Sequence, residues 1–162
     1  MHHTNPIGEN WLLLRGLSRE SAHWGDFLPL LQTQFPTARI HTLDLPGTGR
    51  RHLETSPCTL PEITRAVRAE ALSAGLLDQP LTVLALSLGG MVAWDWMLRY
   101  SSDIAAATLI NTSQAGLSPF YQRLRWQSYS NALRLIRQPD RYHRELAVIE
   151  WVANRRDHDQ TI

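Results

Sequence analysis

A serine stands at the junction between an apolar run and an amphipathic segment. The run Leu81–Leu86 ends directly before Ser87, and the small residues Ala85 and Gly89 flank this serine two positions away on either side. Small residues at this spacing permit a tight turn from a strand into a helix, which exposes the serine hydroxyl. A serine hydroxyl is a weak nucleophile and needs exposure, a neighbouring base and donors for the developing oxyanion. The pattern therefore predicts acyl-transfer chemistry at Ser87.

Two backbone amides are candidate donors for the oxyanion. The N–H of Leu88 belongs to the first turn of the expected helix, where amides have no partner inside the helix. The N–H of Leu17 follows Gly16 in the loop after an earlier apolar run. An alternative interpretation is that Ser87 only caps a helix in an ordinary crossover, because small residues are common in such turns.

The elements that would position these residues alternate along the chain. The predicted strands span residues 11–15, 38–45, 81–86 and 104–110, and the predicted helices begin near Ser18 or Ser21, at the capping box Thr59–Glu62 and at Gly89. Strands that alternate with helices predict an α/β fold with a parallel sheet and helices on both faces. Ligands of such sheets meet the carboxyl ends of the strands. The residues expected at this rim are Gly16, Asp44, Ser87 and Asn111.

The bulk composition excludes several function classes. Sixteen arginines, with no lysine, nearly balance 15 acidic residues and leave a net charge of +1, so no basic surface for nucleic acid is expected. The single cysteine, Cys58, cannot form an internal disulfide, and no uninterrupted apolar run approaches the roughly 18 residues of a membrane span. We expect a cytoplasmic protein with no nucleic-acid or membrane partner, no cofactor and no metal site.

Three motifs together resemble the α/β-hydrolase fold superfamily of serine esterases. They are Arg15-Gly16-Leu17 with Trp24, then Asp44-Leu-Pro-Gly-Thr-Gly49, then Ala85-Leu-Ser-Leu-Gly-Gly90, in this order on the predicted strands. The resemblance covers roughly residues 11–113. It implies that Ser87 is the nucleophile, that Leu17 and Leu88 supply the oxyanion-hole amides, and that the substrate is a small-molecule carboxylic ester or thioester. It also assigns structural turns to the five residues Gly16, Asp44, Gly47, Gly49 and Gly89.

The sequence departs from the family pattern in three places. Arg15 stands where the family commonly has histidine, and Ala85 replaces the first glycine of the elbow. The third departure concerns the catalytic triad, whose acid and histidine follow two later strands in this family. No residue of this sequence matches either position, and Asp44, two strands away at about 4.8 Å per strand, is too far to serve. We therefore predict residues 1–116 as the nucleophile-bearing part of the core and residues 117–162 as the start of a helical lid.

A rival hypothesis is a catalytically silent scaffold. If the sheet ends at the strand Ile104–Ile110, that apolar strand has no partner on its outer side. Free strand edges pair with other chains. This hypothesis predicts self-association or a complementing chain at this edge, and such a chain could also deliver the missing base.

Overall fold

The computed structural model describes residues 9–113, together with residues 140 and 143. The strands are β1 (Asn10–Leu14), β2 (Arg39–Leu43), β3 (Leu81–Leu86) and β4 (Ile104–Ile110). The α-helices are α1 (Phe27–Gln34), α2 (Leu60–Ser73) and α3 (Leu88–Arg99). Short 3-10 turns lie at η1 (Ser21–Trp24), η2 (Gly49–Arg51), η3 (Leu76–Asp78) and η4 (Ser101–Asp103). This alternation confirms the predicted α/β class.

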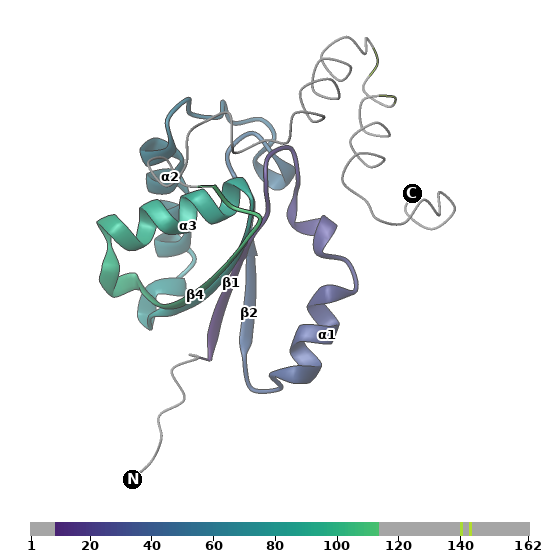
Figure 1. Ribbon diagram of the computed structural model, residues 1–162, viewed down its shortest axis with the longest axis vertical. Helices are drawn as coiled ribbons and strands as arrows, with labels where there is room; N and C mark the ends of the chain where they lie inside the picture. The colour runs from purple at the N-terminus through teal and green to yellow at the C-terminus, as the bar shows by residue number, and fades with distance from the viewer. Residues whose placement is uncertain (1–8, 114–139, 141–142, 144–162) are drawn as a thin grey trace. The chain divides into compact units, whose positions relative to one another are not determined.

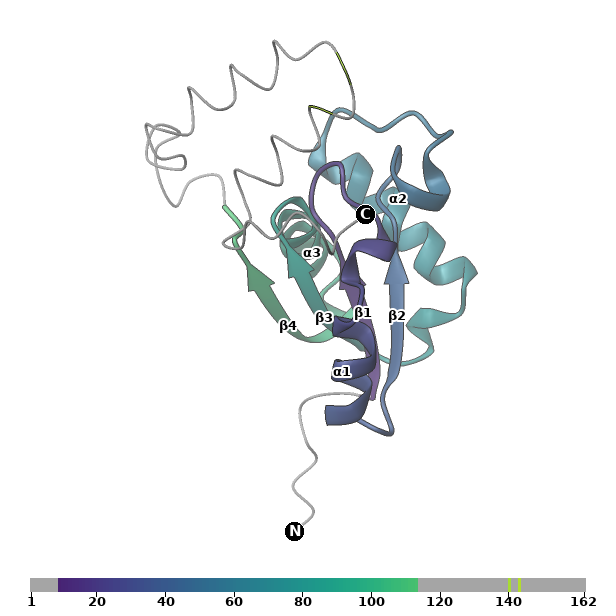
Figure 2. The same cartoon turned by 90° about the vertical axis from the view of Figure 1, so that its right-hand side faces the viewer.

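The described strands form one parallel sheet in the order β2-β1-β3-β4 (Figure 2). Each parallel neighbour is reached through a connection that contains a helix, as parallel pairing requires. β1 and β3 occupy the centre, and almost all of their residues are buried. β2 and β4 are the outer strands of this part of the sheet and are more exposed.

Helices cover both faces of the sheet, with α2 and α3 on one face and α1 on the other (Figure 1). The side chains of β1 alternate between these faces, because successive residues of a strand point in opposite directions. Leu12 and Leu14 pack with the side chains of α2 and α3, whereas Trp11 and Leu13 pack on the side of α1. The carboxyl ends of the central strands are therefore fixed by two hydrophobic clusters.

The helix predicted after the first strand is divided in the structure. Trp24 lies in η1, and the chain turns at Gly25, whose φ is 45°, before α1 begins at Phe27. The apolar spacing of Trp24, Phe27 and Leu31 is helical, but the left-handed backbone of Gly25 interrupts it. Trp24 remains on the buried face and its ring contacts Phe27 at a centroid distance of 5.4 Å.

The predicted capping box is only partly correct. Thr59 is the N-cap of α2, as predicted, but its hydroxyl makes no hydrogen bond to a backbone amide. It donates instead to the Glu62 carboxylate at 2.6 Å. The second strand is shorter than the predicted 38–45, so Asp44 and Leu45 belong to the loop that follows β2.

The predicted helical lid lies outside the described residues, apart from residues 140 and 143, so the proposed division into 1–116 and 117–162 stays a prediction. Among the helices that the structure describes, none has the length and apolar character needed to cross a bilayer.

Deletion of core volume at the centre of the sheet is expected to destabilise the fold. Leu12 is fully buried, so Leu12→Ala should lower the free energy of unfolding by about 2–5 kcal/mol. Leu98 on α3 is 69% exposed, so the same substitution there should change it by no more than about 0.5 kcal/mol. Urea unfolding of both variants measures the difference, and equal losses would contradict the assignment of the core.

Candidate active site

Ser87 lies at the junction between β3 and α3, where the sequence predicts it. Its backbone has φ 52° and ψ −116°, a conformation that residues with a side chain rarely adopt. The side chain is exposed, and the Ser87 N–H donates to the carbonyl of Ile110 at 2.9 Å. The strained turn thus presents a hydroxyl at the carboxyl rim of the sheet, as a nucleophile elbow does.

The elbow depends on a close approach between α3 and the end of β1. A Cβ atom at Gly89 would lie 2.5 Å from the Arg15 carbonyl oxygen and 2.8 Å from that of Leu14. Only glycine fits this position, because both neighbours are backbone atoms that cannot move aside. Gly16 faces the elbow directly, since a Cβ atom built there would lie 3.1 Å from Ser87 Cβ and 3.6 Å from Ser87 Oγ.

The two candidate oxyanion donors, the N–H groups of Leu17 and Leu88, come directly after Gly16 and Ser87 in the sequence. The β1–β3 register pairs Leu14 with Ala85, and the Gly16–Ser87 contact continues this pairing. Leu17 and Leu88 are the next residues of the two segments. In the part of the chain that the structure describes, neither backbone N–H donates to a backbone carbonyl. Within the described residues, these two amides thus have no backbone acceptor, and their role as oxyanion donors stays a prediction.

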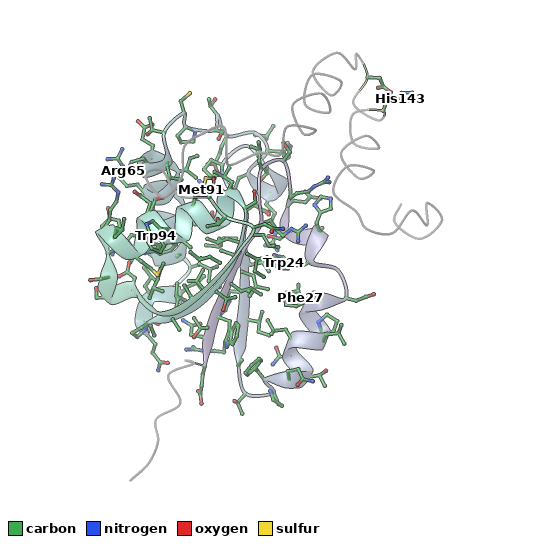
Figure 3. All side chains as sticks on the ribbon, in the orientation of Figure 1. Trp24, Phe27, Arg65, Met91, Trp94 and His143 are labelled. Atoms are coloured by element: carbon green, nitrogen blue, oxygen red, sulfur yellow. The ribbon has the colours of Figure 1, made fainter. Side chains whose placement is uncertain are left out.

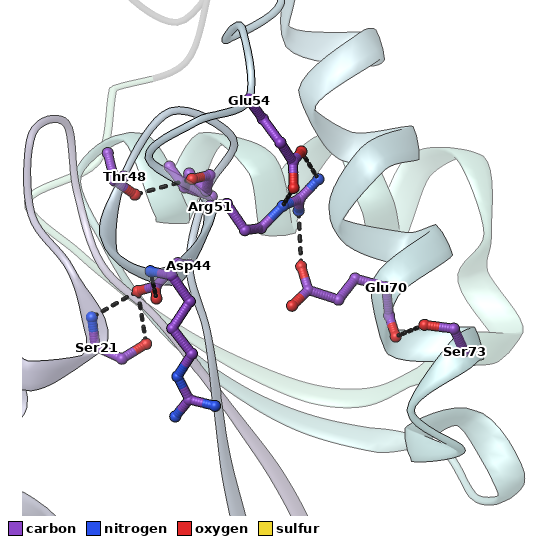
Figure 4. A network of polar contacts seen from close by, with 9 residues as sticks. Ser21, Asp44, Thr48, Arg51, Glu54, Glu70 and Ser73 are labelled. Atoms are coloured by element: carbon purple, nitrogen blue, oxygen red, sulfur yellow. Dashed lines mark hydrogen bonds and ion pairs between the residues drawn. The ribbon is translucent and has the colours of Figure 1, made fainter.

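Asp44 holds the loop that carries Leu17. One carboxylate oxygen accepts from the Ser21 N–H at 2.6 Å and from the Ser21 hydroxyl at 2.7 Å, and the other accepts from the Arg50 N–H at 3.0 Å (Figure 4). Burial raises the pKa of this carboxyl, but the hydrogen bonds from Arg50 and Ser21 outweigh burial and hold the pKa below its ordinary value. Asp44 is thus a charged link between the rim loops that follow β1 and β2.

The two glycines predicted as turns shape the loop after β2. Both have positive φ, 85° at Gly47 and 50° at Gly49. A Cβ atom at Gly49 would overlap the carboxylate of Asp44, so glycine is required there. Arg51 then fastens this loop to α2, because its guanidinium pairs with Glu54 at 2.6 Å and with Glu70 at 2.7 Å (Figure 4).

Arg15 occupies the side of the sheet that faces α1. Its guanidinium lies 4.9 Å from the centroid of the Trp24 ring, which Figure 3 places between the sheet and α1. Burial and the nearby charge of Arg19 lower the pKa of Arg15. The sequence marked Arg15 as a departure from the usual histidine but did not reveal the stacking on Trp24.

The side chains that could act as a base are engaged elsewhere in the described part of the chain. Nδ1 of His23 accepts from the Glu20 N–H at 3.0 Å, and Nδ1 of His52 lies 2.9 Å from the Gly49 carbonyl. His41 lies in the middle of β2, and burial and the charge of Arg39 lower its pKa. No imidazole among the described residues is hydrogen-bonded to Ser87 Oγ.

Two further observations concern acids and metals. In the second compact unit of the chain, residues 115–162, Nδ1 of His143 lies 2.8 Å from the Asp140 carboxylate. Within the described residues, no group of three or more His, Cys, Asp or Glu side chains could hold a metal ion.

Comparison with known proteins identifies relatives of most of this chain. Residues 11–160 match the model of the alpha/beta hydrolase family. The chain is 34% identical over 112 residues to the pimeloyl-[acyl-carrier protein] methyl ester esterase of Edwardsiella ictaluri, which covers 68% of this chain and 40% of the relative. It is 35% identical over 71 residues to the enzyme of the same name from Xanthomonas campestris pv. campestris, covering 44% of this chain and 25% of the relative.

Solved structures share the fold over part of their length. A hydrolase from Pseudomonas aeruginosa PA01 is 24% identical with a TM-score of 0.61, over 90% of this chain and 52% of that one. A lipase-esterase related protein from Clostridium acetobutylicum is 17% identical with a TM-score of 0.58, over 89% of this chain and 60% of that one. The chain thus spans 40% of the Edwardsiella relative and about half of the Pseudomonas hydrolase.

Neutralisation of Asp44 should loosen the rim loops. Because a buried charged acceptor is lost, Asp44→Asn is expected to lower the free energy of unfolding by about 1.5–3 kcal/mol at pH 7. The folded-state pKa of Asp44 is depressed, so its stabilisation is present above the unfolded-state pKa of about 3.9 and is lost as pH falls through the folded-state value. The gap between wild type and variant should therefore narrow below about pH 4.

Urea unfolding between pH 7 and pH 3 measures this gap. Asp26→Asn is the matched control, because Asp26 is exposed and its side chain makes no cap hydrogen bond at α1. A gap for Asp44→Asn that stays constant down to pH 3 would contradict the assigned role of the charge.

Proposed function

Because this chain belongs to the alpha/beta hydrolase family, we propose that it is a serine hydrolase that acts on a carboxylic ester or thioester through a Ser87 acyl-enzyme. The observation that carries this proposal is the exposed Ser87 side chain on a backbone with positive φ, at a turn that Gly16 faces. Relatives named as methyl ester esterases support an ester substrate. The proposed substrate class is a carboxylic ester or thioester of a small acid.

The chemistry follows from this geometry. Ser87 Oγ attacks the carbonyl carbon of the ester, and its proton passes to a base. The carbonyl oxygen becomes an oxyanion, which accepts from the N–H groups of Leu17 and Leu88. The alcohol or thiol then leaves with a proton and an acyl-serine remains. Attack by water on this acyl-serine releases the carboxylic acid and restores the Ser87 hydroxyl.

The proton acceptor sets the expected rate. No imidazole of the described residues is hydrogen-bonded to Ser87 Oγ, and the sequence motifs assign no residue to the triad acid or histidine. Enzymes that lose a triad member keep only about 10³–10⁴-fold acceleration over water, from the oxyanion hole and binding. We therefore expect slow hydrolysis by the 162-residue chain.

Substitution of the proposed nucleophile tests this function. Ser87→Ala should abolish both p-nitrophenol release from p-nitrophenyl acetate above the solvent background and covalent labelling by a fluorophosphonate probe. Ser73→Ala is the matched control, because Ser73 is an exposed serine whose hydroxyl bonds the Glu70 carbonyl at 2.9 Å, at the far end of α2 (Figure 4). Equal rates and equal labelling for wild type and Ser87→Ala would refute the proposal.

A second candidate function is a scaffold that pairs through β4. Residues of β4 are half-buried or exposed apart from Ile104, and Ile110 is 41% exposed, whereas the neighbouring strand β3 is buried. In the described sheet, β4 has a strand partner only on the side of β3. The outer edge of such an apolar strand is a template for another strand, from a second copy or from a complementing chain.

Sedimentation measures this pairing. We expect the protein to self-associate as its concentration rises, and a charge on the edge strand, Thr108→Lys, should shift the equilibrium toward monomer. Thr33→Lys on the exposed face of α1 is the matched control. A wild-type protein that stays monomeric at high concentration argues against the scaffold function.

A further inference from the structure

Thr112 holds the peptide unit that carries one of the two proposed oxyanion donors. Its hydroxyl donates to the carbonyl oxygen of Ser87 at 2.6 Å. This carbonyl and the N–H of Leu88 belong to the same planar peptide unit, so the position of one fixes the position of the other. By fixing the Ser87 carbonyl, the hydroxyl of Thr112 therefore also fixes the direction of the Leu88 N–H at the other end of this planar peptide unit.

The surrounding backbone is built to allow this contact. Asn111 has a φ of 50° and turns the chain after β4 so that Thr112 reaches the elbow. On α3, Gly90 leaves room, because a Cβ atom there would overlap the Thr112 hydroxyl. The same segment also accepts the Ser87 N–H at the Ile110 carbonyl, 2.9 Å away. The end of β4 thus holds the elbow residue at both its N–H and its carbonyl.

We propose that Thr112 is a positioning residue that aims and polarises the Leu88 N–H toward the oxyanion. This inference rests on the proposed function of Ser87. Hydrogen bonds in a chain polarise one another, by about 10–30% per bond, so a donor on the Ser87 carbonyl makes the Leu88 N–H a stronger donor. Oxyanion donors act through fixed geometry. The Met91 N–H in α3 also donates to the Ser87 carbonyl, at 3.1 Å, and so helps to fix this peptide unit.

The experiment compares variants that remove this contact in two ways. Thr112→Val deletes the hydroxyl with little change in shape, whereas Gly90→Ala retains the hydroxyl but displaces it from the Ser87 carbonyl. Thr112→Ser keeps the donor. The matched control is Thr33→Val, which removes a hydroxyl that bonds a backbone carbonyl in the same way, Pro29 at 2.9 Å, on α1.

The first readout is acylation of the full chain by p-nitrophenyl acetate, followed as p-nitrophenol release. For Thr112→Val and Gly90→Ala the maximal acylation rate should fall about tenfold, a fraction of the 10²–10³-fold that loss of a whole oxyanion donor costs. The half-saturating substrate concentration should not change, because an oxyanion donor acts on the charge that develops in the transition state and not on the bound ester. Thr112→Ser and Thr33→Val should react at the wild-type rate.

The second readout needs no turnover. The ¹⁵N and ¹H chemical shifts of the Leu88 amide should move in Thr112→Val and Gly90→Ala and stay in Thr112→Ser. If Ser87→Ala abolishes acylation while Thr112→Val reacts at the wild-type rate, Thr112 has no positioning role. If wild type and Ser87→Ala react equally, the esterase proposal fails, and an unmoved Leu88 amide in Thr112→Val would overturn the present inference separately.

Discussion

The left-handed backbone of Ser87 is the constraint on which the candidate site depends. A residue with a side chain in such a conformation costs on the order of 1–3 kcal/mol and persists only where its surroundings determine it. Here the surroundings act from both sides. The β1 segment approaches α3 so closely that only glycine fits at residue 89, and the end of β4 bonds the Ser87 N–H through Ile110. The strain at the elbow is thus supported by the two strands that flank β3, namely β1 and β4.

The two hydrophobic clusters explain why these supports are rigid. β1 and β3 are buried on both faces, so the positions of their carboxyl ends follow from packing that cannot shift without exposing Leu12 or Val83. The rim loops are held differently. Their fixed points are polar, at Asp44 for the loop after β1 and at Arg51 for the loop after β2. Packing therefore sets the position of Ser87, and hydrogen bonds set the positions of the loops around it.

The difference between elements placed by apolar packing and loops held by hydrogen bonds also decides what the sequence could predict. Apolar runs and their terminating glycines predict the strands to within a few residues, and because parallel strands end at one rim, they also predict that Gly16, Asp44 and Ser87 lie there. The break at Gly25 was not predictable from the helical spacing of Trp24 and Phe27, because both residues remain apolar neighbours on the same face.

Contacts between rim loops were beyond the sequence for another reason. Ser21 and Thr59 both carry a hydroxyl before a helical segment, and such hydroxyls are typical helix caps. In the structure one donates to Asp44, 23 residues away in the chain, and the other to the side chain of Glu62. The Ser21 contact depends on the tertiary approach of two loops, which a local pattern does not encode, whereas the Thr59–Glu62 pair is local and lies within the predicted capping box.

Evolution or design can adjust the proposed oxyanion donors only indirectly. Both proposed oxyanion donors are main-chain amides, so no substitution at Leu17 or Leu88 other than proline deletes them. Their strength and direction can change only through the groups that hold the two peptide units. Asp44 bonds Ser21 after the loop that follows β1, on one side of Ser87, whereas the end of β4 bonds Ser87 from the other side. If these amides are the oxyanion donors, as we propose, substitutions at their supports change both rate and fold stability, because each support also joins two segments of the fold.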